Sequence, residues 1–397
     1  MINVLHVIDK LSMDGINPSS CAQLFAEWYA RHETRRFRVM VANLRAQDSA
    51  GEYLEKRGLE VFYIGQGKFS LANVRAIASL VDERQVDVLH LHGYSSANFG
   101  RLAARHKRIP AVMHEHAILK ILPHQFIADW WLSSKTDIAV AVSNAVADFL
   151  HKGRHVPREK IHVIWNGIDL QAFRRPDRRT SEEFRGRYAG RSQKLIGTVT
   201  RLREEKGNRY FIRAAHEVLR HFPEARFVLV GEGPERGVLE KLAAQFGIQD
   251  RVHFAGFVHD VPSALAAFDV AVIPSLREGF GLALAEAMAA DKPVIATRVG
   301  GMVEMAGHEQ EALLVPPADA PALAQAILEM VTDPSKAERL GAAASRRSND
   351  FSMEKNVAAL EALYERLALG RQKSLMGTST ARTQTDSLSQ RELTIRI

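Results

Sequence analysis

The chain has 397 residues, a formal net charge of +7 and one cysteine, Cys21. This length allows two domains with separate cores, and the 46% apolar and 25% charged content is ordinary for a globular protein. A single cysteine excludes an intramolecular disulfide and a four-cysteine zinc site. No apolar run reaches the roughly 18 residues that a membrane-spanning helix needs.

Residues 1–166 alternate short β-branched runs with amphipathic stretches. The opening "MINVLHVIDK" leads straight into a strand and lacks the features of a secretion signal, so we expect a cytoplasmic protein. Runs such as "DIAVAVS" are apolar on both faces, as in parallel strands that helices cover on each side. We therefore predict a doubly wound α/β domain over residues 1–166.

The same pattern restarts after a polar, basic connector, and it predicts a second α/β domain over residues 167–350. Residues 351–370 are predicted to form a helix that returns to the first domain. Residues 371–397 are rich in Ser, Thr, Arg and Gln, which favours a disordered tail. Two facing α/β domains place a cleft between the carboxyl ends of their sheets, where such sheets bind ligands.

Four histidines follow two neighbouring strands of the first domain, in "VLHLHG" and "IPAVMHEH". They are His90, His92, His114 and His116. Side chains two positions apart on a strand project to one side, which is compatible with a zinc site. A second interpretation places one of these side chains beside a substrate, without metal.

Two cations, Arg201 and Lys206, follow the first strand of the second domain in "GTVTRLREEKG". Together they can neutralise a leaving diphosphate. The alternative is a pair of solvated loop charges.

The segment "LREGFGLALAEAMAAD" holds two carboxylates, Glu278 and Glu286, eight positions apart. On an unbroken helix they would be about 12 Å apart, whereas paired hydrolase carboxylates are about 5 to 9.5 Å apart. The glycine turn between them instead directs each to a different part of one elongated ligand. The amides of Phe280, Gly281 and Leu282 lie near a helix start, which favours anion binding. The pattern suits a nucleotide sugar; surface glutamates are the alternative.

Four motifs in this order, "TRLREEKG", "FVLVGEGPER", "VHFAGFV" and "IPSLREGFGLALAEAMAADKPVIATRVGGMVEM", resemble the second domain of the group 1 retaining glycosyltransferases. The resemblance includes the E-x7-E motif, and it extends over residues 1 to about 365. It implies the GT-B fold, two Rossmann-like domains facing a central cleft. It also implies hexose transfer from a UDP- or GDP-linked sugar to a glycan, lipid-linked or small-molecule hydroxyl, in bacterial polysaccharide or glycoconjugate biosynthesis.

The resemblance also assigns roles to individual residues. The first-domain loop "SMDGINPSS" departs from the family pattern, because it has one glycine, Gly15, where many members have two. The predicted catalytic residues are His116, Arg201, Lys206 and Glu278, and the predicted donor-binding residues are Gly15, Phe257, Gly279, Phe280, Gly281, Leu282 and Glu286.

The resemblance implies no metal and no cofactor, because the nucleotide sugar is itself a substrate. The expected partners are this donor and a glycan or lipid-linked acceptor, without nucleic acid. Segment 118–135, which contains Trp130 and Trp131, predicts either peripheral contact with the inner face of a membrane or a helix packed beside the acceptor cleft.

The alternatives to a glycosyltransferase are a non-catalytic sugar-nucleotide-binding protein, a phosphorylase and a hydrolase. "VGEGPERG" lacks dinucleotide-binding spacing.

Overall fold

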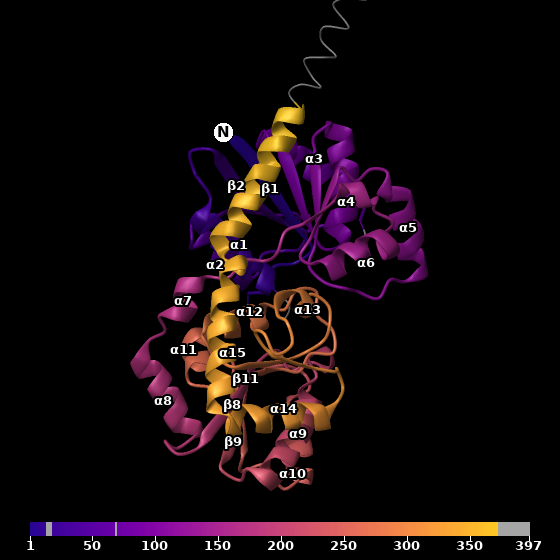
Figure 1. The fold of residues 1–397 in the computed structure, drawn as a ribbon. Coiled ribbons are helices and arrows are strands. Elements are labelled where there is room, and N and C mark those ends of the chain that lie inside the picture. The colour runs from indigo at the N-terminus through magenta and orange to yellow at the C-terminus, as the bar shows by residue number, and fades with distance from the viewer. Residues whose placement is uncertain (13–17, 68–69, 372–397) are drawn as a thin grey trace, which may run out of the picture.

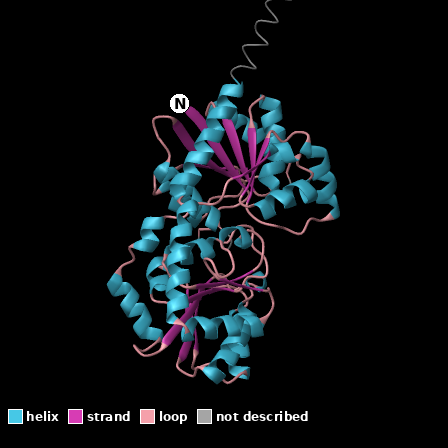
Figure 2. Ribbon diagram, viewed as in Figure 1, coloured by secondary structure: helices cyan, strands magenta, loops and turns pink. Residues whose placement is uncertain are grey.

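The computed structural model describes residues 1–12, 18–67 and 70–371. Two parallel β-sheets, each flanked by helices, lie one above the other and form two α/β units (Figures 1 and 2). This arrangement confirms the predicted fold class. The upper unit in the figures is built from the first part of the chain and the lower unit from the second.

The first sheet has seven strands in the order β3-β2-β1-β4-β5-β6-β7. Neighbouring residues Val4 and Leu5 of its central strand are both fully buried, and they belong to separate apolar clusters on the two faces. Burial on both faces explains the continuous apolar runs of the sequence. The strands are β1 (Ile2–Ile8), β2 (Phe37–Asn43), β3 (Glu60–Tyr63), β4 (Val88–His92), β5 (Ala111–Glu115), β6 (Ile138–Ala141) and β7 (Ile161–Val163).

Helices connect these parallel strands. α6 begins after Ser143, whose hydroxyl accepts from the Val146 amide, and α1 begins after Ser19, whose hydroxyl accepts from Ala22. Such N-caps fix where each helix starts. The helices are α1 (Ser20–Arg31), α2 (Ser49–Glu55), α3 (Ala72–Glu83), α4 (Tyr94–Lys107), α5 (Pro123–Ser133), α6 (Asn144–Arg154) and the 3-10 turn η1 (Arg158–Lys160).

The second sheet has six parallel strands in the order β10-β9-β8-β11-β12-β13. They are β8 (Lys194–Val199), β9 (Ala225–Val230), β10 (Val252–Gly256), β11 (Val270–Ile273), β12 (Val294–Thr297) and β13 (Leu313–Val315). The surrounding helices are α7 (Leu170–Arg174), α8 (Arg178–Tyr188), α9 (Asn208–His221), α10 (Arg236–Gln245), α11 (Val261–Ala266), α12 (Leu282–Ala289), α13 (Met302–Met305), α14 (Ala320–Thr332) and α15 (Pro334–Arg347), with 3-10 turns η2 (Glu204–Lys206) and η3 (Ser348–Phe351).

Strand order reverses beside the first strand of each sheet, between β1 and β4 and between β8 and β11. In open α/β sheets, ligands bind at such a reversal, beyond the carboxyl ends of the strands. The fold therefore singles out the loops after β8 and β11 before any chemistry is considered.

The chain crosses between the two units twice, and the two crossings lie side by side. Ile168 donates its amide to Phe351 at 2.9 Å, and Met353 donates to Ile168 at 2.9 Å. Residues 353–371 are helical and pack against the first sheet, where the Trp28 indole donates to Asn356 at 2.6 Å (yellow helix in Figure 1). The predicted disordered tail beyond this helix lies outside the described residues.

None of the described helices is long and apolar enough to span a membrane.

Candidate functional site

A cleft of about 750 Å³ lies between the two units. The first unit lines it with residues from α1 and from the loop after β5. The second unit lines it with the loops after β8 and β11 and the start of α12. The cleft therefore lies at the strand-order reversal of the second sheet, as the topology predicts.

Lys206 and Glu278 form an ion pair in this cleft. The Lys206 Nζ donates to the Glu278 Oε1 at 2.6 Å, and both side chains are largely buried. The Ser275 hydroxyl donates to the same oxygen at 2.8 Å. Because one Glu278 oxygen receives both bonds, the carboxylate is held in one orientation, with its second oxygen available for a ligand hydroxyl.

The backbone of the two loops is packed too tightly for a side chain at Gly207. Its φ is +68°, and a Cβ there would lie 1.9 Å from the Pro274 carbonyl oxygen. The amide of Leu276 donates to the Glu205 carbonyl at 2.8 Å and ties the loops together. Glycine therefore allows the Lys206 loop to approach the Glu278 loop closely.

Glu286 lines the cleft from the first turns of α12. Burial raises the pKa of its carboxyl to about 7, with Lys206 opposing the shift. Within the part of the chain that the structure describes, no hydrogen-bond donor contacts this carboxylate. A carboxyl group in this state can accept bonds from ligand hydroxyls that replace the lost water.

The turn Gly279–Gly281 joins the two acids. Gly281 has φ +109° and caps α12, and the Phe280 ring packs into the core against Phe351. The backbone, not the phenyl ring, therefore faces the cleft, together with Leu282. The N-terminus of the eight-residue α12 points its free amides at this space, and it favours a negatively charged group.

Arg201 also lines the cleft, and its side chain is exposed. The structure thus brings together two predicted cations, two predicted acids and the predicted turn: Arg201, Lys206, Glu278, Glu286, Gly279, Phe280, Gly281 and Leu282.

Four buried histidines lie beneath the first-unit side of the cleft, and with the half-buried His116 they form two hydrogen-bonded rows. In one row His92 contacts His6 and His116, with both nitrogen–nitrogen distances at 3.0 Å. In the other row His90 contacts His114 at 3.0 Å and the Tyr364 hydroxyl at 2.6 Å. The hydrogen bonds run diagonally across the sheet: the register pairs His6 with His90 and His92 with His114, and each ring bonds instead to the histidine two positions further along the neighbouring strand.

These imidazoles are neutral. Burial lowers the pKa of His6 to about 3 and of His116 to about 4, and it holds the pKa of His90, His92 and His114 well below the ordinary value. A neutral imidazole both donates and accepts, so each row orders the protons of its members.

Two overlapping groups of three histidines, His6–His90–His92 and His92–His114–His116, each bring ring nitrogens within 4.8 Å of one another, close enough to hold a metal ion. In the structure these nitrogens are largely bonded to each other. The four histidines that the sequence pointed to do not all reach the cleft. His116 lines the cleft, whereas His114 lies below it.

One predicted donor-binding residue, Phe257, does not line the cleft, and another, Gly15, lies outside the part of the chain that the structure describes. Phe257 follows β10, is 49% exposed and packs its ring against His259. Its contact with a base stays a prediction.

Three further residues that shape the cleft were not predicted from the sequence. Ser275 orients Glu278, and Ser143 donates from the first unit to the Gly279 carbonyl at 2.6 Å. Glu304 of α13 accepts from the Asn144 and Ala145 amides at 2.9 and 3.0 Å, so a carboxylate of one unit sits on the N-terminus of α6 in the other. The sequence can indicate that Ser143 caps a helix, but it cannot show that Ser143 contacts Gly279 across the cleft.

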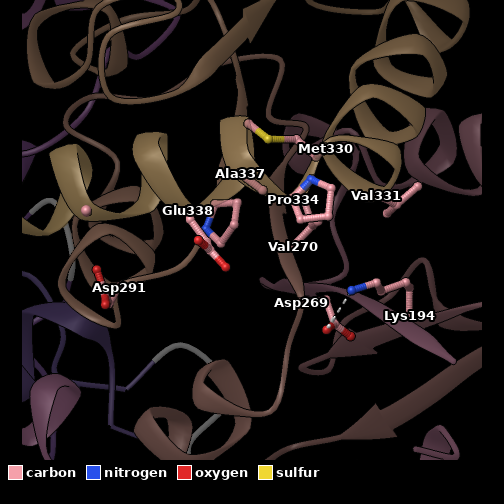
Figure 3. Close-up of a pocket in the computed structure, with 11 residues that line it drawn as sticks. Lys194, Asp269, Val270, Asp291, Met330, Val331, Pro334, Ala337 and Glu338 are labelled. Carbon is pink, nitrogen blue, oxygen red and sulfur yellow. Dashed lines mark ion pairs between the residues drawn. The ribbon is translucent and has the colours of Figure 1, made fainter. Parts of the chain in front are cut away.

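A second hollow, of about 390 Å³, lies at the opposite end of the second sheet (Figure 3). Lys194 and Asp269, which form an ion pair there, lie at the amino ends of β8 and β11. The amino ends of parallel strands are not where α/β sheets bind ligands, and we assign the cleft as the functional site.

Both units match known families. Residues 180–347 match the family "Glycosyl transferases group 1" and residues 23–172 match "Glycosyltransferase Family 4". The chain is 28% identical over 70% of its length to an α-D-kanosaminyltransferase of Streptomyces kanamyceticus, of which it covers 77%. It is 33% identical over 60% of its length to the lipopolysaccharide core mannosyltransferase LpcC of Rhizobium leguminosarum, of which it covers 66%.

Solved structures share the fold at low sequence identity. Anabaena Alr3699/HepE, solved in complex with UDP, aligns with a TM-score of 0.80 at 22% identity, over 92% of this chain and all of that chain. A glycosyltransferase from Rickettsia africae aligns with a TM-score of 0.82 at 20% identity, over 92% of this chain and 98% of that chain.

Proposed function

Because the chain belongs to the group 1 glycosyltransferases and has their GT-B fold, we propose that it transfers a hexose from a nucleotide-diphosphate sugar to an acceptor hydroxyl. The observation that carries this proposal is the Lys206–Glu278 pair at the strand-order reversal of the second sheet. The pair places a cation that can bind a diphosphate, Lys206, beside a carboxylate that can bind sugar hydroxyls, Glu278. HepE, which shares the fold, binds UDP, and this supports a nucleotide in the cleft.

Each group in the cleft has a part in donor binding. Glu278 would accept hydrogen bonds from the hydroxyls of the transferred sugar, and Glu286 from those of the ribose. The α12 N-terminus and the turn before it would donate backbone amides to the phosphates. Lys206 and Arg201 would neutralise the diphosphate. The two acids therefore serve the two ends of one donor.

We propose that the transfer retains the anomeric configuration, because the acceptor attacks from the face that the diphosphate leaves. The acceptor hydroxyl forms a bond to the anomeric carbon on the face from which the diphosphate leaves. The carbon–phosphate oxygen bond breaks, and a phosphate oxygen takes the hydroxyl proton. Lys206 and Arg201 stabilise the charge that develops on the diphosphate, so the reaction needs no separate protein base.

His116 would contact the transferred sugar from the first unit. Its neutral ring lines the cleft, and His92 orders its tautomer through the 3.0 Å contact. A neutral imidazole can hydrogen-bond a sugar hydroxyl without placing a second cation beside Lys206. His116 therefore suits positioning of the sugar.

We also propose that the reaction needs no metal ion, because Lys206 and Arg201 supply the positive charge. Activity should survive chelation with EDTA, and Mg²⁺ or Mn²⁺ should not restore any loss. Activity that depends on added divalent metal would contradict this part of the proposal.

The acceptor would be a glycan or lipid-linked hydroxyl in bacterial polysaccharide or glycoconjugate biosynthesis, reached from the cytoplasm. The mannosyltransferase LpcC acts, by its name, in lipopolysaccharide core biosynthesis, and the kanosaminyltransferase is also a sugar transferase. These relatives support a bacterial glycosylation role and leave open UDP or GDP as the nucleotide.

The proposal is tested by incubating the protein with UDP- and GDP-linked hexoses and measuring release of the nucleoside diphosphate. One nucleotide class should be consumed, slowly with water and faster with an acceptor, and NMR should show an α-linked product from an α-linked donor. Glu278→Ala should abolish turnover and keep the fold. An inverted product would refute retention, and binding without any turnover would favour a non-catalytic sugar-nucleotide-binding protein.

A further inference from the structure

The helix α5 presents its apolar side chains to solvent. Ile127 and Trp130 are 66% and 65% exposed, and Phe126 and Trp131 are about half exposed. At 100° per residue these four positions occupy one arc of the helix. A helix on the surface of a water-soluble protein usually turns this arc inward.

Buried charged residues hold α5 in this orientation, with its apolar side chains facing the solvent. Asp129, on the opposite side of α5, is 1% exposed and accepts two hydrogen bonds from Arg154 at 3.0 and 3.1 Å. Arg154 also pairs with Glu115 at 2.7 Å, and Arg101 donates to the Leu132 carbonyl at 3.2 Å. Rotating α5 to hide its tryptophans would expose this network and break it, so the outward apolar face is a stable feature of the fold.

The apolar surface continues from α5 into the loop before it. Leu119 and Leu122 are 55% and 45% exposed. With aromatic side chains of about 150–250 Å² each, the surface formed by Leu119, Leu122, Phe126, Ile127, Trp130 and Trp131 covers on the order of 600 Å². Most water-soluble monomers expose smaller patches unless the patch binds something. We call this surface the α5 patch.

The lysines that flank the α5 patch are the exposed Lys120 and the half-buried Lys135. Lys120 precedes α5, and Lys135 follows it with its Nζ 3.7 Å from the Trp131 ring centroid. Neighbouring α6 adds the exposed Lys152, and its acid Asp148 is already paired with Arg158 at 2.6 Å. Tryptophans with flanking lysines match the interface of an anionic lipid bilayer, which takes up the rings and attracts the cations.

The patch is continuous with the mouth of the cleft. Leu119, the first residue of the patch, also lines the cleft, together with the neighbouring Lys120. In Figure 1, α5 lies on the outer rim of the first unit, beside α6 and away from the last helix. A flat surface that contacted α5 would therefore lie next to the acceptor side of the cleft.

We propose that the α5 patch docks the protein on an anionic lipid bilayer and so presents the cleft to an acceptor held at that bilayer. The statement about the acceptor rests on the proposed function, whereas the docking does not. Trp130 and Trp131 insert at the level of the headgroups, and Lys120 and Lys135 contact the lipid phosphates. Docking leaves the donor groups of the second unit untouched.

The test is co-sedimentation of the full chain with phosphatidylcholine vesicles, with and without about 30% phosphatidylglycerol. The protein should bind the anionic vesicles and be released by salt. The double variant Trp130→Ser/Trp131→Ser should bind about tenfold or more weakly. Val238→Ser, which removes a 47% exposed apolar side chain from α10, is the matched control and should bind like the wild type.

Quenching by brominated lipids gives a second measurement. Trp28 is 1% exposed, so bromine in the acyl chains should quench Trp130 and Trp131 and spare Trp28. Failure of the wild type to bind anionic vesicles, or equal binding of the double variant, would overturn the proposal. Self-association that the double variant abolishes, without vesicle binding, would overturn it in favour of a dimer interface.

Donor consumption separates this proposal from the proposed function. The double variant should release nucleoside diphosphate in water at the wild-type rate, because neither tryptophan lines the cleft. If no donor is consumed by any form while vesicle binding follows the predicted pattern, docking stands and the transferase proposal fails. If the protein consumes donors but does not bind vesicles, the transferase proposal stands and the docking proposal fails.

Discussion

Lys206 is already positioned by its ion pair with Glu278 before a donor binds. When a diphosphate arrives, the ammonium can contact phosphate and carboxylate together, since it has three donors. The donor therefore meets a cation already positioned beside the acid that is proposed to hold its sugar. Preorganised charge of this kind stabilises a transition state more than a mobile side chain does.

Lys206→Ala should lower kcat/KM for the donor by about 100-fold or more, because it removes a preorganised cation and leaves Glu278 uncompensated. Steady-state kinetics of diphosphate release measure this effect. Arg209→Ala is the control, because Arg209 pairs with Glu235 at 2.6 Å and lies outside the cleft. A Lys206→Ala enzyme within about threefold of wild type would remove Lys206 from the mechanism.

Glu286 should make donor affinity depend on pH. The carboxylate accepts ribose hydroxyls best when ionised, and burial raises its pKa to about 7. Affinity should therefore rise between about pH 6 and 8. Calorimetry should use the intact nucleotide sugar, whose pyrophosphate diester does not titrate there. Glu286→Gln should remove the dependence, and a slope that survives in this variant would assign it to another group.

The same shift has a consequence for stability without ligand. The pKa of Glu286 is higher in the folded chain, about 7, than its ordinary value of 4.5. The folded state therefore prefers the protonated acid, and this contribution to stability falls as the pH rises from about 4.5 to about 7. Thermal unfolding should show the wild type losing stability relative to Glu286→Gln as the pH rises across this range, because the other titrating groups, including the buried histidines, are shared by both proteins.

At the scale of single elements, the buried strands could be predicted because a strand covered on both faces shows a continuous apolar run. "DIAVAVS" contains β6, as expected. The histidine rows could not be predicted, because they depend on which strands are neighbours and on their register. The sequence grouped His90, His92, His114 and His116 on two neighbouring strands, and only the sheet adds His6 and shows which rings bond to each other.

The orientation of α5 was also beyond the sequence, which left contact with a membrane and packing beside the cleft as alternatives. The deciding contacts involve Arg101, Glu115 and Arg154, which lie on three other elements. An isolated helix with this composition would turn its tryptophans inward. The buried ion network around Asp129 overrides that preference.

Asp129→Ala should destabilise the first unit by about 3–5 kcal/mol, because it leaves two buried arginines short of a partner. Urea unfolding followed by circular dichroism measures the change, with the midpoint of the unfolding transition as the observable. Asp148→Ala breaks an exposed pair with Arg158 and should leave the midpoint unchanged. Equal midpoints for the two variants would show that the network does not fix α5.

At the scale of the whole molecule, the two units are held together across the cleft by few bonds. Glu304 accepts from the N-terminus of α6, and Ser143 donates to Gly279, the first residue of the turn before α12. The two chain crossings lie side by side near Ile168 and Met353, which suits a hinge. These contacts bridge the cleft, and those of Glu304 and Ser143 lie next to the turn Gly279–Gly281.

Glu304→Ala should open the cleft, because it removes a carboxylate from a helix N-terminus and leaves the α6 amides to water. Small-angle scattering should show a larger radius of gyration, and donor affinity should fall by about tenfold. Glu309→Ala, which loses only a pair with Lys336 inside the second unit, should match the wild type. An unchanged radius together with unchanged affinity would show that Glu304 has no role in closure.

The two-domain architecture and the location of the site were predictable, because strand and helix alternate twice and the E-x7-E segment carries its own glycine turn. Contacts between the units were not, since Glu304 and Ser143 acquire their partners only when the two halves face each other. The predicted role of Phe257 also depends on geometry, and its exposed position leaves it a prediction.

The central claim is that the groups around Lys206, Glu278 and Glu286 bind a nucleotide diphosphate. Calorimetric titration of UDP, GDP and the matching monophosphates tests it most directly. We predict that one diphosphate binds at one site per chain, that its monophosphate binds about tenfold or more weakly, and that Lys206→Ala removes this difference. If neither diphosphate binds, or if Lys206→Ala binds it as tightly as the wild type, the assignment of the cleft as the donor site is wrong.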